Sequence, residues 1–183
     1  TTSGAFSIAD PAGNVATTTV TGSDRSVTYD SVAPTLTLAQ AAAQADPTNV
    51  RTIAFTLSAN EVLDATTVTA ADFSVSDGTV TSIACSGASC TITVTAITDG
   101  VVSITLAPSG AFSVSDLAGN AQTVAGGTDR SVTYDTTAPT VTLQQGFTQS
   151  DPTSGSTIAF RLLSNEDLSA GTITASDFAV TSG

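Results

Sequence analysis

The sequence contains no histidine, methionine, tryptophan or lysine. Without histidine or lysine, the chain has no general base to activate a serine or cysteine nucleophile. Paired carboxylates of the glycosidase type stay formally open among sixteen acidic residues, but nothing singles out a pair, and aromatic residues make up only 5% of the chain. We therefore expect that the chain is not an enzyme.

Positive charge is also scarce, since only Arg25, Arg51, Arg130 and Arg161 are basic and the formal net charge is −12. Four scattered arginines do not form the basic stripe that binding to phosphate groups requires. Apolar runs all fall well short of the roughly 18 residues of a membrane helix. We expect no nucleic-acid partner and no direct membrane insertion. The excess of acidic residues either serves only to keep the protein soluble or favours the binding of divalent cations.

Cysteine occurs only twice, as Cys85 and Cys90 in the run CSGASC. A zinc site would need more Cys or His ligands, and a redox CxxC motif has a shorter spacing. A disulfide across a hairpin tip, with residues 86–89 as the turn, is the expected arrangement, and a pair of free thiols is the alternative. A disulfide would indicate an oxidising, extracellular compartment.

The abundant residues are Thr, Ser, Ala, Val, Gly and Asp, a composition typical of an all-β fold. The dipeptides Asp77-Gly78 and Asp99-Gly100 predict tight turns between alternating runs. Seven short runs with alternating apolar residues predict strands, and no run predicts a helix. The expected strands are 35–39, 52–58, 72–76, 79–84, 91–97, 101–107 and 130–134.

The apolar residues at alternate positions of these runs predict the core of a two-sheet sandwich. Its aromatic members are expected to be core residues and not a ligand platform. The expected core residues are Leu36, Leu38, Ile53, Phe55, Leu57, Phe73, Val75, Ile92, Val94, Ile104, Leu106, Phe112 and Tyr134.

The chain repeats itself with a period of about 105 residues. The run DRSVTYDSVAPTLTL at 24–38 returns as DRSVTYDTTAPTVTL at 129–143, and GAFSIADPAGN at 4–14 returns as GAFSVSDLAGN at 110–120. This period suits one small β-sandwich domain. Boundaries at the two Ala-Pro steps divide the chain into an N-terminal segment (1–33, the end of one repeat), a central segment (34–138, a complete repeat) and a C-terminal segment (139–183, the start of another).

The repeated runs APTLTL, QADPT, TIAF, DLAGN and SVTYD resemble the tandem bacterial Ig-like repeats of very large surface proteins. The resemblance covers essentially the whole chain, with CSGASC and the Asn60-Glu61 pair as departures from the usual pattern. It implies Ig-like β-sandwich repeats in tandem, in a stalk or adhesin spacer at the bacterial cell surface, with neighbouring repeats as partners. An Ala-Pro step between copies would stiffen each joint.

Acidic and amide side chains recur near the expected junctions between repeats and predict calcium sites, because Ca²⁺ binds carboxylate and amide oxygens on loops. Asx turns and strand caps are the alternative role for the same side chains. The set around the second junction is Asp116, Asn120, Asp135, Asp151 and Glu166, and the set one repeat earlier is Asp10, Asn14, Asp30, Asp46 and Glu61.

Two other functions compete with a passive spacer. An incomplete sandwich exposes unpaired strand edges, so identical chains joined by strand complementation into a self-assembling extracellular filament are the main alternative. A carbohydrate-binding sandwich is disfavoured by the absence of tryptophan and the low aromatic content.

Overall fold

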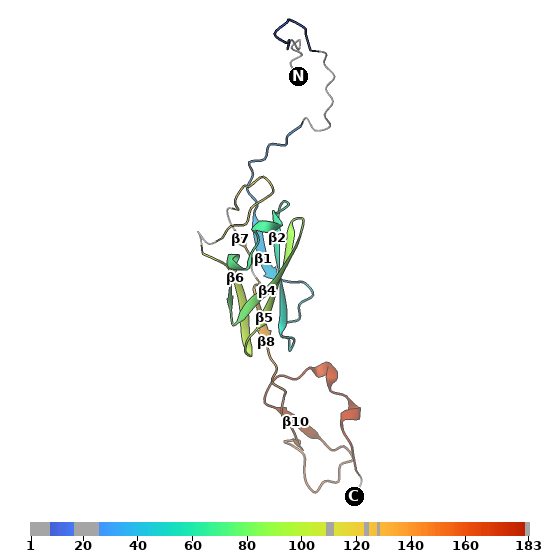
Figure 1. Cartoon of the computed structure of the whole chain (residues 1–183). Helices are drawn as coiled ribbons and strands as arrows, with labels where there is room; N and C mark the ends of the chain where they lie inside the picture. Colours follow the sequence, from blue (N-terminus) through green and yellow to red (C-terminus); the bar gives the residue numbers. More distant parts are fainter. Residues whose placement is uncertain (1–7, 17–25, 109–111, 123–124, 128, 182–183) are drawn as a thin grey trace. The chain divides into compact units, whose positions relative to one another are not determined.

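The computed structural model describes residues 8–16, 26–108, 112–122, 125–127 and 129–181 (Figure 1). The chain divides into two compact units, Thr1–Val32 and Ala33–Gly183. Regular structure in the described residues is almost entirely β-strand in antiparallel sheets, with only short 3-10 turns besides. The all-β expectation is therefore confirmed.

A five-stranded sheet in the central segment has the order β4-β5-β2-β1-β7. Neighbouring strands of this sheet are antiparallel, except that β7 runs parallel to β1. Alternate residues of β2 point into the core, as the period-2 pattern of the sequence requires. The strands are β1 (Leu36–Gln40), β2 (Thr52–Ala59), β4 (Gly78–Ser86), β5 (Ser89–Ala96) and β7 (Ala125–Gly126).

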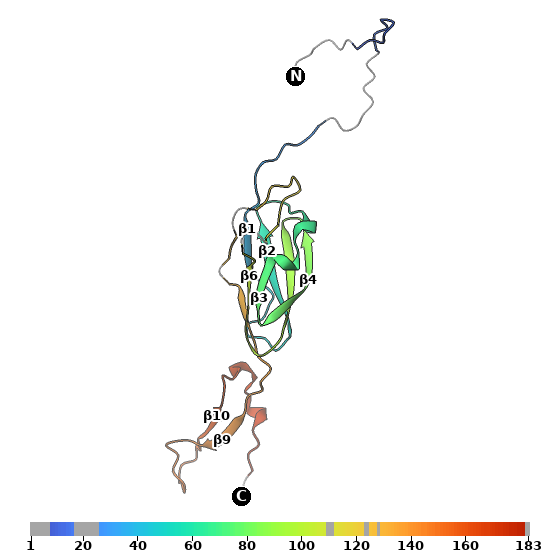
Figure 2. The ribbon, with the colours of Figure 1, turned by 60° about the vertical axis from the view of Figure 1, so that its left-hand side comes forward.

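A three-stranded sheet, with the order β3-β6-β8, lies on the other side of the same core (Figure 2). It consists of β3 (Phe73–Ser76), β6 (Gly100–Leu106) and β8 (Ser131–Tyr134). Buried residues of both sheets belong to one continuous cluster, so the arrangement is sandwich-like. All seven expected strands are present, and within the central segment the two-residue β7 is the one described strand that the sequence did not predict.

The two Asp-Gly dipeptides lie where the chain crosses between the sheets, and neither closes a hairpin. Asp77 separates β3 from β4, and Asp99 precedes β6, while β3 pairs with β6 and β4 with β5. Asp77 adopts φ 51°, a left-handed conformation that aspartate tolerates better than most residues. The turns predicted from these dipeptides therefore lead the chain from one sheet to the other.

The tight hairpin of the fold joins β4 to β5 at Gly87 and Ala88. Gly87 has φ 59°, as the first central residue of a type II′ turn requires. Cys85 and Cys90 face each other across the two strands and form a disulfide, with Cα atoms 3.9 Å apart. The expected disulfide is therefore present, and Cys90 is also a fully buried member of the core.

Most of the expected core residues are buried, including Leu38, Ile53, Phe55 and Ile92, which are all 0% exposed. Val75, Leu106 and Phe112 are only partly buried and pack against the edge of the core. Further buried residues were not predicted: Leu63, Val68, Cys90, Ala96, Val102, Val114 and Val132.

The C-terminal segment repeats the first elements of the central segment. It contains β9 (Val141–Gln145), paired antiparallel with β10 (Phe160–Ser164), and the 3-10 turns η3 (Ala170–Thr172) and η4 (Ala175–Asp177). Their counterparts are β1, β2, η1 (Ala65–Thr67) and η2 (Ala70–Asp72). In both segments the Asp-Pro peptide bond between the first two strands, before Pro47 and before Pro152, is cis.

No helix in the described part of the chain is both long enough and apolar enough to span a membrane. Of the expected N-terminal segment, the structure describes residues 8–16 and 26–33, and within the first unit Ala9 forms an isolated antiparallel bridge with Val15.

Candidate cation-binding carboxylates

The Asp116–Asn120 loop is a compact turn held together by the aspartate side chain. Asp116 Oδ1 accepts hydrogen bonds from the backbone N–H groups of Ala118 and Asn120, both at 2.8 Å, and Asn120 Nδ2 donates to Asp116 Oδ2 at 2.8 Å. Gly119 provides the left-handed residue of the turn, with φ 87°. The Asx-turn role considered for this loop is therefore realised.

Hydrogen bonding keeps Asp116 in its charged form. The bond from the Asn120 side chain lowers the pKa of Asp116, and burial, the next cause in size, acts in the opposite direction. The side chain is only 3% exposed. A buried carboxylate that remains ionised is the kind of group that either belongs to a hydrogen-bonded turn or binds a cation.

The first unit contains the same turn, one repeat earlier in the sequence. Asp10 Oδ1 accepts from Ala12 N at 3.0 Å and from Asn14 N at 2.9 Å, while Asn14 Nδ2 donates to Asp10 Oδ2 at 2.8 Å. The Asn14 side chain is likewise the largest cause that lowers the pKa of Asp10. The Asp-x-Ala-Gly-Asn sequence thus adopts the same local geometry at both of its positions in this chain.

Glu61 lies in a loop that the disulfide-linked hairpin holds in place. The carbonyl oxygen of Ala88 accepts a hydrogen bond from Ala59 N at 2.7 Å, and that of Gly87 accepts one from Leu63 N at 3.1 Å. Both acceptors belong to the two-residue turn next to the Cys85–Cys90 bridge. The hairpin tip therefore fixes the backbone on either side of Glu61.

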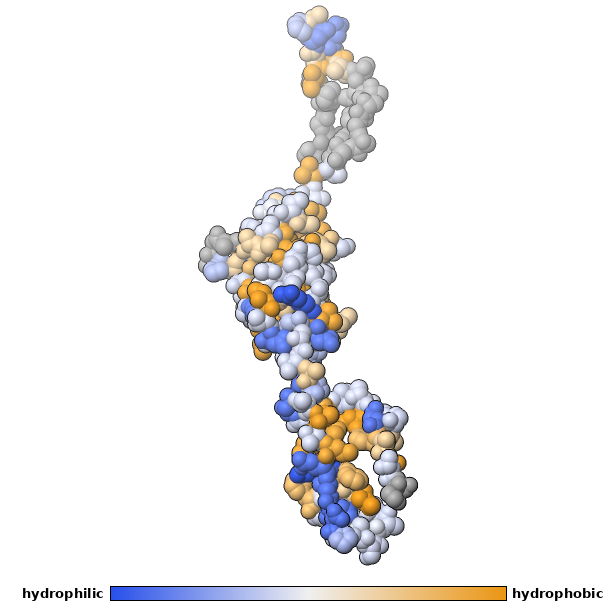
Figure 3. Space-filling model, turned by 60° about the horizontal axis from the view of Figure 1, so that its bottom comes forward, coloured by the Kyte–Doolittle hydropathy of each residue, from blue (hydrophilic) through white to orange (hydrophobic). Residues whose placement is uncertain are grey.

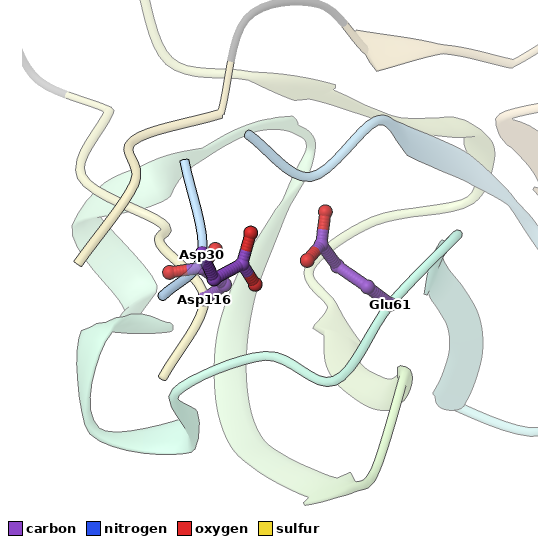
Figure 4. Close-up of side chains that lie close together, drawn as sticks. All are labelled: Asp30, Glu61 and Asp116. Carbon is purple, nitrogen blue, oxygen red and sulfur yellow. The ribbon is translucent and has the colours of Figure 1, made fainter. Parts of the chain in front are cut away.

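Glu61 and Asp116 come together because Leu63 forms an antiparallel bridge with Asp116. One carboxylate oxygen of Glu61 lies within 4.8 Å of one of Asp116 (Figure 4). Two negative groups at this distance repel each other, and the repulsion is relieved either by a proton or by a cation. Oxygen donors from two carboxylates match the preference of Ca²⁺.

Asp30, the third side chain in Figure 4, belongs to the first unit, where its Oδ1 accepts a hydrogen bond from Val32 N at 3.0 Å. Asp30 precedes Thr35 by five residues. Thr35 is fixed to the Glu61 loop, because its N–H donates to Asn60 Oδ1 at 2.6 Å and its carbonyl accepts from Asn60 N at 3.3 Å.

Asp46 and Asp135 lie at the opposite end of β2 from Glu61 and Asp116. Asp46 Oδ1 accepts from Thr133 N at 2.9 Å, and Asp135 N donates to the carbonyl of Thr48, which precedes β2. Eight residues of extended strand span about 26 Å. The structure therefore groups Asp116 with Glu61 and separates it from Asp135, whereas the sequence predicts Asp116 and Asp135 in one set and Glu61 in the other.

The C-terminal segment repeats the arrangement around Glu61. Thr140 N donates to Asn165 Oδ1 at 2.6 Å, as Thr35 N does to Asn60. The next residue, Glu166, has a buried Oε1 that finds no hydrogen-bond donor among the described residues. Asp151, by contrast, is exposed.

Two further aspartates tie loops together and were not predicted. Asp72 is fully buried and accepts hydrogen bonds from Thr69 N at 2.7 Å and Ser113 N at 2.7 Å. The Thr-x-x-Asp capping box is the sequence signal that would have found it. Asp99 accepts from Thr136 N at 3.1 Å and from the Thr137 hydroxyl at 3.1 Å, and so binds the segment that leaves β8.

Comparisons of the chain with protein-family models, with curated proteins and with solved structures found no match.

Proposed function

We propose that this chain is a segment of tandem Ig-like β-sandwich repeats in an extracellular surface protein, where it acts as a stalk or adhesin spacer and not as an enzyme. Its role is to set distance and orientation. The partners are the neighbouring repeats of the same protein. Tandem copies of one domain add length without adding chemistry.

The observation that carries this proposal is the repetition of one junction geometry. The asparagine after the second strand accepts a hydrogen bond at 2.6 Å from the threonine that follows the Ala-Pro step, at Asn60–Thr35 and again at Asn165–Thr140. The bond fixes the entry of the chain into each segment. Such repetition suits a spacer, in which each copy adds the same unit of length, better than a binding site for one particular ligand.

The extracellular, bacterial-surface location rests on the disulfide and on the resemblance of the repeated runs. A Cys85–Cys90 bridge persists in an oxidising compartment and would be reduced in most cytosols. The excess of acidic residues, with a net charge of −12, favours the solubility of such an extracellular protein.

We further propose that Ca²⁺ binds Glu61 and Asp116 and so stiffens the contact between the two loops that carry them. Glu61 and Asp116 already bring carboxylate oxygens within 4.8 Å of each other. Glu166, the counterpart of Glu61 in the C-terminal segment, has a buried Oε1 that finds no hydrogen-bond donor among the described residues, and a cation would compensate its charge.

Light scattering on the purified chain over a series of concentrations tests the spacer against the filament. A constant monomer mass is expected for a spacer. The filament alternative is favoured by the apolar side chains that the C-terminal segment exposes (Figure 3), including Phe160 at 63%. Mass that rises with concentration would therefore reject the passive spacer in favour of self-assembly.

A further inference from the structure

The first and last strands of the central segment run side by side in the same direction. Strand β7 pairs parallel with β1, so that residues 125–126 lie opposite residues 36–37. Further along both strands, Gln40 N donates a hydrogen bond to the Asp129 carbonyl at 2.6 Å. The chain therefore leaves the central segment in contact with the strand by which it entered.

The same parallel contact continues at the other end of the segment. Thr48 N donates to the Thr133 carbonyl at 2.9 Å, and the Thr48 carbonyl accepts from Asp135 N at 2.9 Å. Asp46 adds a side-chain contact, because its Oδ1 accepts a hydrogen bond from Thr133 N at 2.9 Å. Two stretches that are far apart in the sequence are thus joined along most of their length.

The parallel pairing, defined as the contacts between residues 36–48 and residues 125–135, is close and shielded from water. Leu38 is 0% exposed and Thr48 is 8% exposed. A side chain at Gly127 would collide with the Leu38 carbonyl oxygen, so the two stretches approach each other more closely than a larger residue allows. Hydrogen bonds in such a low-dielectric place are stronger than hydrogen bonds in water.

The chain enters and leaves the central segment at opposite ends. Thr35 is bonded to Asn60, which follows β2, whereas Asp135 is bonded to Thr48, which precedes β2. In Figures 1 and 2 the chain likewise enters the two-sheet sandwich at one end and leaves it at the other. A pull on both ends of the segment therefore acts along the strands and drives the two partners of the parallel pairing past each other.

This direction of pull loads many hydrogen bonds at once. The bonds of a parallel ladder are evenly spaced, and sliding one strand along the other strains all of them together. Release of either partner from the fold requires the whole pairing to break. The Cys85–Cys90 disulfide does not relieve this load, because it lies within the β4–β5 hairpin and joins neither partner of the parallel pairing.

We propose that the parallel pairing makes the central segment resistant to tension applied through its two ends. The segment then withstands force in addition to setting distance. This inference goes beyond the spacer function, for which length and orientation are sufficient. A mechanically weak segment would leave the spacer standing, and the light-scattering result does not depend on the resistance to force.

The test is single-molecule force spectroscopy on the full 183-residue chain, pulled in two directions. The chain has no lysine, so Asn49→Lys and Ile97→Lys together introduce side-chain amines that the original chain lacks. These positions flank the ends of β2 and β5 where Thr52 pairs with Thr95, and a pull there opens this antiparallel ladder one bond at a time. The same variant, tagged at both chain ends, is also pulled end to end, so the two experiments differ only in the direction of the load.

We expect the central segment to unfold at a higher force in the end-to-end pull than in the pull between positions 49 and 97. Forced unfolding is governed by the unfolding rate, and only the end-to-end pull has to break the whole parallel pairing at once. Its event is recognised by a gain in length of roughly 300 Å, as expected for about 100 residues that extend from a folded domain. Equal forces, or a lower force in the end-to-end pull, would overturn the proposal.

Asp46 provides a test of one contact within the parallel pairing. Asp46→Ala removes the hydrogen bond from Thr133 N and should speed unfolding about fivefold under a constant end-to-end load, the factor that corresponds to one hydrogen bond. Asp46→Asn keeps an accepting oxygen and should unfold at close to the original rate.

Asp64→Ala is the matched control, because it removes a comparable hydrogen bond from Thr66 N, at 2.9 Å, within a single loop. Both alanine variants should lose similar stability in urea, but only Asp46→Ala should unfold faster under load. The Asp64 loop can stay intact while the parallel pairing breaks. An equal acceleration in both variants would reject the parallel pairing as the part of the fold that resists the load.

Discussion

Asn60 Oδ1 accepts a hydrogen bond from the backbone N–H of Thr35 at 2.6 Å, and so links the entry of the central segment to the loop after β2. We expect Asn60→Ala to lower the free energy of unfolding of the central segment by about 1 kcal/mol, the usual contribution of one hydrogen bond. The measurement is urea unfolding followed by circular dichroism.

Asn165→Ala is the matched control, since it removes the same bond to Thr140 in the C-terminal segment. It should leave the unfolding midpoint of the central segment unchanged. If both variants shift this midpoint equally, the bond does not act locally.

Phe55 and Phe160 occupy equivalent positions with opposite burial, 0% and 63% exposed. We expect Phe55→Ala to cost about 4 kcal/mol, because it removes a large core side chain and leaves a cavity. Phe160→Ala should change the unfolding free energy by less than about 0.5 kcal/mol, as a substitution at an exposed position. Urea unfolding of both variants measures these changes in unfolding free energy. A large loss of stability in Phe160→Ala would show that the Phe160 side chain is covered in solution.

The disulfide is predicted to act on the Glu61 loop as well as on its own hairpin. Replacing Cys85 and Cys90 together with Ala should cost about 2 kcal/mol, from the chain entropy of so short a loop. Amide exchange at Ala59 and Leu63 should speed up, because their acceptors lie in the hairpin turn. The Ala96 amide, bonded to Arg51 O at the other end of β5, should not change. Faster exchange at Ala96 as well would indicate general loosening.

The strands were predictable because their signal is local. In β2, apolar residues alternate with polar ones, so the sequence around Phe55 indicates both the strand and its buried face. Cys90 was read only as a hairpin-tip residue, yet it packs fully in the core. Apolar character alone did not show which neighbour each strand selects, and for this reason it did not show that the Asp-Gly turns connect strands of different sheets.

The candidate site was less predictable than the strands, because it depends on contacts between distant parts of the chain. The acidic residues and the Asp116 turn are visible in the sequence. The approach of Glu61 to Asp116 follows from the bridge between Leu63 and Asp116, which no local pattern encodes. The hydrogen bond from Thr136 N to Asp99 likewise joins residues that are distant in the sequence, because Asp99 precedes β6 and Thr136 follows β8.

The Asp99 clamp is predicted to open in acid. The hydrogen bond from Thr136 N, followed by that from the Thr136 hydroxyl, lowers the pKa of Asp99. A carboxylate with a lowered pKa in the folded state stabilises that state above its unfolded pKa of about 3.9, and the contribution is lost as the pH falls through the lower, folded value.

The Thr136 amide resonance in NMR spectra should therefore titrate with a midpoint below 3.9, the ordinary value for Asp. In Asp99→Asn this titration should disappear, since the amide side chain does not ionise in this range. A Thr136 titration that survives in Asp99→Asn would refute the clamp.

Calcium is predicted to raise the melting temperature of the chain through Glu61 and Asp116. Binding to the folded state alone stabilises it by mass action, so excess chelator should lower the melting temperature of a calcium-loaded sample. Glu61→Gln should abolish the response to calcium. Without calcium this variant should be no less stable than the original chain, because it also removes the repulsion from Asp116. Asp64→Asn changes a half-buried carboxylate that accepts a hydrogen bond from Thr66 N in the nearby turn; it is the charge-matched control and should keep the response. A melting temperature indifferent to both calcium and chelator would rule out the site.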